Sequence, residues 1–206
     1  LGLAVALCRL SRHRLLREVA TFYVEVVRGI PVLVLLFYIA FVGAPQIVAL
    51  WNAVFAAPIA SGFLPEMSVR DFDMTWRAIV ALMVSYSAFI AEIFRAGIEA
   101  VPKGHVEAGG SLAMSKWEVL RYVVLNQAFR KVYPALSSQI IIVMLGSAVV
   151  SQISAPDLTY AANFVQSRNF RAFEVYFLAA LLYLLLAILT RALLRGLGRK
   201  LFKAAS

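Results

Sequence analysis

The sequence contains little charge and almost no cysteine. Only 15% of its 206 residues are charged and 62% are hydrophobic, whereas about a quarter of the residues in an ordinary soluble domain are charged. This composition excludes a typical soluble globular protein, and it excludes intrinsic disorder, which requires low hydrophobicity. Cys8 is the only cysteine, so no disulfide scaffold can form within the chain. The class that remains is an integral membrane protein.

Sequence motifs of enzymes and metal sites are also missing. No HExxH, GxSxG or cysteine cluster occurs, and neither does a glycine-rich phosphate-binding loop. His13 and His105 are the only histidines. We therefore expect no catalytic residue, no metal site and no cofactor in this chain, which by itself cannot hydrolyse ATP.

Four apolar stretches are long enough to cross a bilayer, which takes about 20 helical residues because no water satisfies an open backbone there. They are residues 24–43, 76–98, 135–155 and 173–194. Residues 1–10 are apolar but too short to span at about 1.5 Å per residue, and we expect them to be the end of a span whose beginning is absent. The sequence thus predicts an all-α, polytopic membrane protein with five transmembrane helices, the first of them truncated.

Basic residues set the expected orientation, because lysine and arginine are in excess on the cytoplasmic side of a membrane protein. With five spans, only four of the 20 basic residues fall on one side, namely Arg70, Arg77, Arg168 and Arg171. The others are Arg9, Arg12, Arg14, Arg17, Arg28, Arg95, Lys103, Lys116, Arg121, Arg130, Lys131, Arg191, Arg195, Arg199, Lys200 and Lys203. We therefore expect the N-terminus outside and the C-terminus inside. The net charge of +9 then reflects membrane topology and gives no support to a nucleic acid partner.

In this topology residues 44–75 form a periplasmic loop. Residues 46–57 are expected to be a helix lying in the outer interface, with Trp51 as an amphipathic anchor. Pro58 and Gly62 interrupt the apolar run, which is why we do not count it as a further span.

The cytoplasmic segment 99–134 carries the strongest local signals. A short helix of small residues is expected over residues 105–114, followed by a capping box in which Ser115 is the N-cap and Glu118 stands three residues later. The next helix is expected to stop before Pro134. The product would be a compact helical hairpin, too small to be a catalytic domain.

This segment resembles a known family. It contains EAGGSLAMS at residues 107–115 and VLNQAFRKVYP at residues 124–134, which together are similar to the EAA loop of permease subunits of bacterial ABC importers. Three further stretches, FYVEVVRGIPVLVLLFYIAF, SAFIAEIFRAGIEAVPKGHVEAG and SAPDLTYAANFVQSRNFRAFEVY, resemble polar amino acid permeases with the MetI-like fold. The resemblance covers nearly the whole chain, so that residues 1–206 would be one transmembrane permease domain. Ala113 stands where the family usually has glycine, and Asn126 where it usually has proline.

The resemblance implies a mechanism. The EAA helix of this family is a coupling helix seated in a cleft of a cytoplasmic ATPase dimer, which holds ATP and Mg²⁺. The coupling residues here would be Glu107, Ala108, Gly109, Gly110, Ser111, Leu112 and Ala113. The other implied partners are a second permease subunit, identical or related, a periplasmic amino-acid-binding protein and the lipid of the bacterial inner membrane. A capped surface hairpin without a partner is the alternative interpretation.

Two pairs of opposite charge have the spacing i, i+3, which places both members on one side of a helix. They are Glu25 with Arg28 and Glu92 with Arg95, and we interpret both as structural ion pairs. Glu92 also lies within a span, where a carboxylate is a functional candidate. The resemblance and polarity together suggest these substrate-pathway candidates: Ser85, Ser87, Glu92, Gly146, Ser147 and Gln152. For each serine, packing with a bond to its own backbone is the alternative.

Residues 145–148 read Leu-Gly-Ser-Ala, where the family often has a Lys-Asp-Thr-Ser type sequence. This difference removes a charge that could have indicated the substrate. Pro31, inside the span 24–43, is expected to kink that helix.

The expected function is therefore import of a polar amino acid by alternating access, with the chain as a permease subunit. An ion-driven secondary transporter, or another polytopic membrane protein without an ATPase partner, is the competing hypothesis. A secondary transporter predicts inverted repeats and several carboxylates near the bilayer midplane. The sequence has neither.

Overall fold

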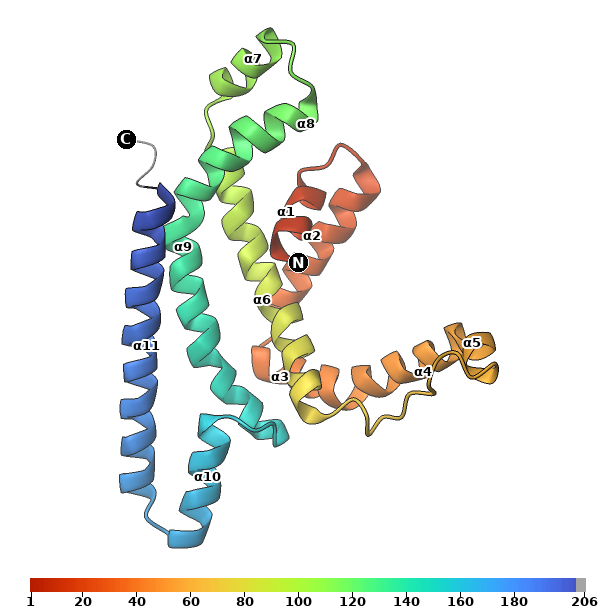
Figure 1. Ribbon diagram of the computed structural model, residues 1–206, viewed down its shortest axis with the longest axis vertical. Helices are drawn as coiled ribbons and strands as arrows, with labels where there is room; N and C mark the ends of the chain where they lie inside the picture. Colours follow the sequence, from red (N-terminus) through yellow and green to blue (C-terminus); the bar gives the residue numbers. More distant parts are fainter. Residues whose placement is uncertain (203–206) are drawn as a thin grey trace. The chain divides into compact units, whose positions relative to one another are not determined.

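The computed structural model describes residues 1–202, and that part of the chain is helical with no strand. Lys203, one of the residues used to orient the chain, lies outside the described residues, as does the rest of the tail to residue 206. Figure 1 labels the helices. Their bounds are α1 Gly2–Arg9, α2 Arg14–Gly29, α3 Val32–Phe37, η1 Tyr38–Gly43, α4 Ala44–Val54, α5 Ala56–Ala60, α6 Met74–Glu99, α7 Lys103–Ser111, α8 Lys116–Glu118, η2 Val119–Val124, α9 Leu125–Gly146, η3 Ser147–Ile153, α10 Leu158–Asn169 and α11 Ala172–Phe202. Of these, η1 and η2 are π-helical and η3 is a 3₁₀ helix.

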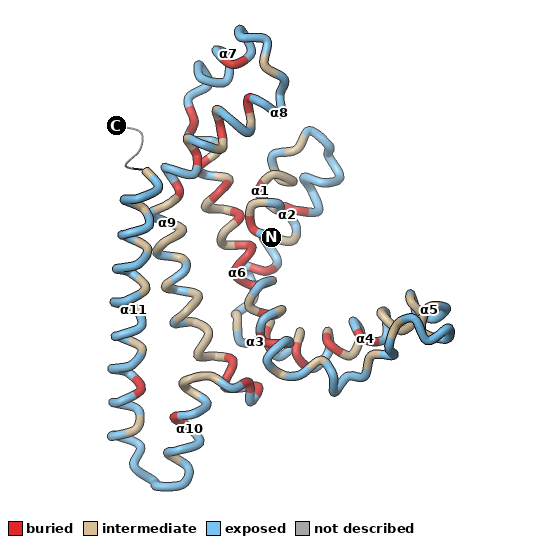
Figure 2. The backbone as a smooth tube through the Cα atoms, in the orientation of Figure 1, coloured by how far each residue is buried: buried red, intermediate tan, exposed pale blue. Residues whose placement is uncertain are grey.

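Four helical runs among the described residues are long and apolar enough to cross a membrane: Val32–Val54, Met74–Glu99, Lys116–Ile153 and Ala172–Phe202. The last three contain most or all of the predicted spans 76–98, 135–155 and 173–194. In α11 only Ala179 is buried, and Figure 2 shows the rest of that helix as almost wholly exposed. An apolar helix with so little cover needs lipid or another protein around it.

The predicted span 24–43 is wrong at both ends. Pro31 does not kink a continuous helix but separates two: α2 ends at Gly29, and Pro31 is the extended N-cap residue of α3, with ψ 136°. Proline cannot donate a helical hydrogen bond and pushes the residue before it toward extended backbone, so a break costs less here than a kink. The helical run also does not end at residue 43. It continues through the π-helical η1 into α4, so that α3, η1 and α4 form one run over Val32–Val54.

The helix after the capping box was predicted to stop before Pro134, and this prediction is wrong. The helix continues through Pro134 to Gly146. An interior proline costs about 3 kcal/mol in a helix. Ending the helix among the apolar residues after Pro134 would leave backbone groups without partners inside the bilayer, each at a cost of several kcal/mol. The helix instead includes Pro134 and runs on unbroken to Gly146.

The described residues fall into two compact units. The first consists of Leu1–Arg28, Tyr86–Leu145 and the chain from Tyr183 onward. One of its cores is made of Val101, Val119, Val124 and Ala128, which joins the end of α6 to the hairpin. Close helix contact in this unit depends on absent side chains, because a Cβ at Gly97 would overlap the side chain of Val132.

The second unit consists of Gly29–Ser85 and Gly146–Leu182. Its buried core combines a few aliphatic residues with many alanines: Leu36, Ala40, Ala78, Ala81, Val150, Ile153 and Ala155. Small side chains let helices approach closely, which is how membrane helices gain packing energy without a hydrophobic effect between them.

A buried arginine fastens the start of α6 in this second unit. Arg77 is 8% exposed, and its guanidinium donates to three carbonyl oxygens: Phe72 at 2.6 Å, Val69 at 2.6 Å and Ala40 at 3.1 Å. Asn52 adds a second fastening, since its amide exchanges two hydrogen bonds with the backbone of Met67. The sequence alone places Arg77 on the outer side, at the start of the predicted span 76–98. In the structure its bonds hold the preceding loop and η1 against α6.

The turn after α7 explains one departure from the family pattern. Met114 N donates to the Gly109 carbonyl (3.2 Å) and Ala113 N to the Gly110 carbonyl (3.0 Å), which is a Schellman motif. Ala113 occupies its left-handed position with φ +56°, where glycine is preferred. The helix therefore ends with glycine-type geometry although the residue is alanine.

Replacing Arg77 by alanine should destabilise the protein by about 2–4 kcal/mol, because hydrogen bonds to a charged donor are strong and the Ala40 carbonyl is left in a buried site. Arg70→Ala is the matched control, since Arg70 is exposed. Thermal unfolding in detergent measures the stability of both variants. Equal unfolding midpoints for the two would contradict a stabilising role of the Arg77 hydrogen bonds.

Replacing Ala113 by glycine should stabilise the end of α7 by about 1 kcal/mol, because glycine adopts positive φ without a Cβ clash. The same substitution at Ala108, inside α7, should instead destabilise by about 0.5–1 kcal/mol. Hydrogen exchange of the α7 amides reports both changes. Slower exchange in A113G and faster exchange in A108G is the expected pattern, and the same sign in both would contradict this account of the turn.

Candidate functional site

The predicted coupling residues lie on α7 and the turn after it, and the structure divides them into two sets. Gly109 is buried, and a Cβ added to it would lie 2.9 Å from Val119 Cγ2 of η2. Gly110 is exposed, and a Cβ there would meet nothing within 4 Å. The others, Glu107, Ala108, Ser111, Leu112 and Ala113, are exposed as well. Gly109 therefore serves the hairpin itself, while the remaining six face away from it.

The outward surface has little internal bonding of its own. Within the described residues the Glu107 carboxylate has no hydrogen bond or ion pair, and its backbone carbonyl accepts from Ser111 Oγ (3.1 Å). Leu112 is 77% exposed and Trp117 is 61% exposed. Exposed large apolar side chains on the same hairpin as an unpaired carboxylate are typical of a protein interaction site.

The hairpin beneath this surface is well fastened. The capping box is present: Ser115 N donates to Glu118 Oε2 (2.7 Å), and Glu118 N donates to Ser115 Oγ (3.3 Å). His105 Nδ1 is bonded to Gln127 Oε1 at 2.8 Å, and Lys131 Nζ donates to the Ala100 carbonyl oxygen. In Figure 1 α7 folds back beside α8 and the start of α9. The His105 bond joins α7 to α9, and the Lys131 bond joins α9 to Ala100, the residue after the end of α6.

Glu92 forms the centre of a charge cluster in the first unit. Its Oε2 accepts from Arg95 Nη2 (2.9 Å) and Nε (3.0 Å), while its Oε1 contacts Arg9 Nη1 and lies 3.8 Å from Arg28 Nη1. Arg95 also bonds Glu99 Oε2 at 2.7 Å. Because α1, α2 and α6 each contribute a charged side chain, this carboxylate ties three helices together.

The expected pair of Glu25 with Arg28 does not form. Glu25 is exposed and has no ion pair among the described residues. Arg28 instead stacks on the Phe89 ring, 5.5 Å from its centroid, and reaches toward Glu92. The i, i+3 spacing was correct, but a half-buried carboxylate attracts the guanidinium more strongly than one in water does.

The uncharged pathway candidates lie in different surroundings. Ser85 is buried and donates to the Ala81 carbonyl at 2.7 Å, and Ser87 is buried with its Oγ 2.6 Å from the Tyr23 hydroxyl. Gly146 is the residue at which α9 becomes the 3₁₀ segment η3, and Ser147 is the first residue of η3. Gln152 is exposed. The two buried serines thus already have protein partners.

Sequence reasoning missed two features of this site. The approach of Arg9 and Arg28 to Glu92 joins residues that are far apart in the chain, so no local spacing could show it. The inward role of Gly109 was not separated from that of Gly110, although a residue one position away on a helix points about 100° away.

Comparison with known proteins agrees with this architecture. The family described as "Binding-protein-dependent transport system inner membrane component" matches residues 1–203. The chain is 31% identical over 201 residues to the glutamine transport system permease protein GlnP of Escherichia coli K12, covering 98% of this chain and 83% of the relative. It is also 31% identical over 201 residues to the arginine transport system permease protein ArtQ of Bacillus subtilis, with 98% and 82% covered.

Among solved structures, one described as the crystal structure of an amino acid ABC transporter with histidines superposes with a TM-score of 0.73. It has 33% sequence identity and covers 97% of this chain and 83% of the other. The chain therefore belongs to the family of inner membrane components of binding-protein-dependent transport systems.

Proposed function

We propose that this chain is the permease subunit of an ABC importer that passes a polar amino acid from a periplasmic binding protein into the cytoplasm by alternating access. The observation that carries the proposal is the outward face of α7, built on a fastened hairpin in a chain that matches the permease family over residues 1–203. ATP and Mg²⁺ would be held by the partner ATPase, since the sequence has no phosphate-binding loop of its own. The relatives named for glutamine and arginine transport support an amino acid as substrate.

The hairpin has the properties that a coupling element needs. Its outer face carries small residues at positions 108, 110 and 111, over which another protein's backbone can approach closely. The Val101 core packs the hairpin against the end of α6, and the His105 bond joins α7 to α9. The Lys131 bond ties α9 to Ala100, the residue after α6. A push on α7 is therefore passed to two long helices and is not absorbed by a loose loop.

A second permease subunit completes the proposal. The apolar, exposed length of α11 requires cover, and a single chain of this family supplies half of a translocation path. The five-helix count and the orientation with the C-terminus inside belong to the same proposal, supported by the distribution of basic residues.

Gly110 gives a sharp test of coupling, because it is exposed and an added Cβ there would meet nothing within 4 Å among the described residues. Gly110→Trp should leave thermal stability of the isolated chain unchanged and should weaken ATPase binding at least about tenfold, the effect of 1.4 kcal/mol. Copurification of the ATPase and ATP-driven uptake in proteoliposomes are the measurements. ATP-independent uptake driven by an ion gradient would instead support a secondary transporter.

Gly196→Trp is the matched control, since Gly196 is also an exposed helical glycine at which an added Cβ would meet nothing within 4 Å. It should retain ATPase binding. Wild-type ATPase binding and wild-type uptake in Gly110→Trp would contradict the assignment of α7 as the coupling helix.

We further propose that Glu92 is a structural centre and not a substrate ligand. Glu92→Gln should destabilise the protein more than Arg28→Gln. The Glu92 variant loses the ion pair with Arg9, which is 15% exposed and in contact, whereas the Arg28 variant loses only a pair at 3.8 Å whose arginine is 46% exposed. In a double-mutant cycle, Glu92 and Arg9 should show a coupling of about 1–3 kcal/mol in unfolding free energy. A change in substrate KM with no loss of stability and no coupling would assign Glu92 to the pathway instead.

A further inference from the structure

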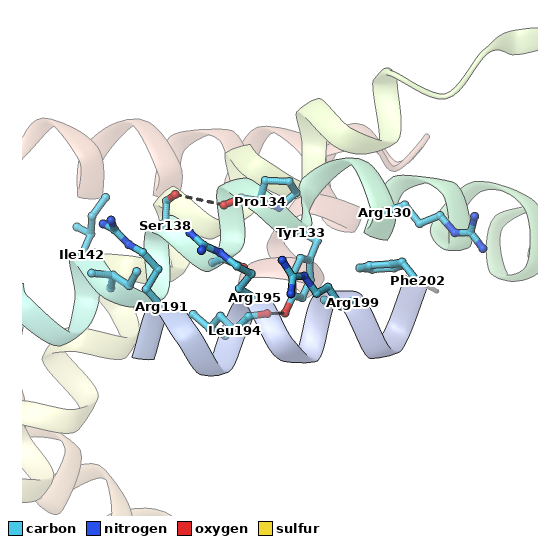
Figure 3. Close-up of a pocket in the computed structure, with 13 residues that line it drawn as sticks. Arg130, Tyr133, Pro134, Ser138, Ile142, Arg191, Leu194, Arg195, Arg199 and Phe202 are labelled. Atoms are coloured by element: carbon cyan, nitrogen blue, oxygen red, sulfur yellow. Dashed lines mark hydrogen bonds between the residues drawn. The ribbon is translucent and has the colours of Figure 1, made fainter. Parts of the chain in front are cut away.

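A basic cavity of about 680 Å³ lies between α9 and the last part of α11, within the first unit. Four arginines line it: Arg191, Arg195 and Arg199 from α11, and Arg130 from α9. Figure 3 shows the three α11 arginines extending toward α9 from one side of their helix. Their spacing of four residues produces this stripe, because residues i and i+4 lie on the same face.

Specific contacts between α9 and α11 form the walls of the cavity. Tyr133 donates its hydroxyl to the Leu194 carbonyl at 2.5 Å, which joins α9 to α11. Gly198 permits that approach, since a Cβ there would overlap the Tyr133 ring. Phe202 packs edge-on against the same ring, with centroids 5.2 Å apart. A hydrogen bond and an ordered aromatic contact thus join the two helices beside the cavity.

The positive charge in this cavity is not neutralised. Among the described residues, none of the four arginines forms an ion pair with a carboxylate. Guanidinium groups are suited to phosphate because they donate two parallel hydrogen bonds to its oxygens. Four of them around one space favour an anionic group with several oxygens.

The depth of the cavity in the membrane indicates where that anion comes from. Arg191 lies 19 residues after Ala172, the first residue of α11, or about 28 Å along the helix at 1.5 Å per residue. A hydrocarbon core is about 30 Å thick. With Ala172 at the outer boundary of the span, Arg191 stands at the inner boundary, and Arg195 and Arg199 lie beyond it at the level of the lipid headgroups. Ile141, Ile142 and Leu194 line the same cavity and add an apolar surface beside the charges.

We propose that this cavity binds the headgroup phosphate of an anionic phospholipid, such as phosphatidylglycerol, from the leaflet that the proposed orientation assigns to the cytoplasm. The arginines hold the phosphate, and the aliphatic residues contact the first part of the acyl chains. Basic pockets between membrane helices on this side suit such lipids. A soluble anion would gain nothing from the apolar lining.

Native mass spectrometry of the full chain purified with its ATPase tests the proposal, with phosphatidylglycerol and phosphatidylcholine titrated separately. The wild type should retain phosphatidylglycerol in preference to phosphatidylcholine. The double variant Arg191→Gln/Arg195→Gln should bind phosphatidylglycerol about 25-fold more weakly, or about fivefold for each arginine removed. If the double variant does not assemble, Arg195→Gln alone should show the fivefold loss.

Arg12→Gln/Arg14→Gln is the matched control, since both residues are exposed, lack an acidic partner among the described residues and lie outside the cavity. It removes the same net charge and should keep wild-type lipid affinity. Equal loss in the two double variants, or equal retention of both lipids by the wild type, would overturn the proposal. Full displacement of phosphatidylglycerol by millimolar inorganic phosphate would overturn the lipid as the source of the anion. The readout requires neither ATP nor substrate, so it is separate from the test of transport.

Discussion

The bilayer accepts no open backbone group, and this constraint accounts for the features of the chain that local rules do not predict. A helix that ended among the apolar residues after Pro134 would leave unpaired carbonyls inside the membrane, and α9 instead runs on unbroken to Gly146. Pro31 stands between two helices instead, directly before the candidate span Val32–Val54. Arg77 satisfies backbone groups with a side chain: its guanidinium donates hydrogen bonds to three carbonyl oxygens near the start of α6.

Close helix packing is the second requirement, and small residues meet it at each contact. Gly97 admits Val132, Gly198 admits the Tyr133 ring, and Gly109 admits Val119. A hydrophobic effect between helices is absent in lipid, so the attraction that remains is van der Waals contact at short range. These glycines therefore contribute to stability because they lack a side chain, whereas an added Cβ at Gly110, as at Gly196, would meet nothing within 4 Å among the described residues.

Composition and periodicity were enough to predict the all-α class, three of the spans and the capping box of Ser115 and Glu118. Those features depend on residues that are neighbours in the sequence. Pro31 and Pro134 were both assigned wrongly, because whether a proline breaks a helix depends on its depth in the membrane and on what packs beside it. The pairing of Arg28 with Glu92 in place of Glu25 depends on a neighbouring helix. Long-range partners of this kind have no signature in a single sequence.

Within the described part of this chain, the buried and half-buried charges have partners, and two structured surfaces carry charges without one. Glu92 holds three arginines, and Arg77 is satisfied by backbone. The exposed Glu107 on α7 and the arginine stripe of α11 have no such partner among residues 1–202. Unpaired charge on a structured surface retains its capacity to bind. The two surfaces differ in sign and in shape, and this is why the first suits a protein that seats on a helix and the second suits the phosphate of a lipid.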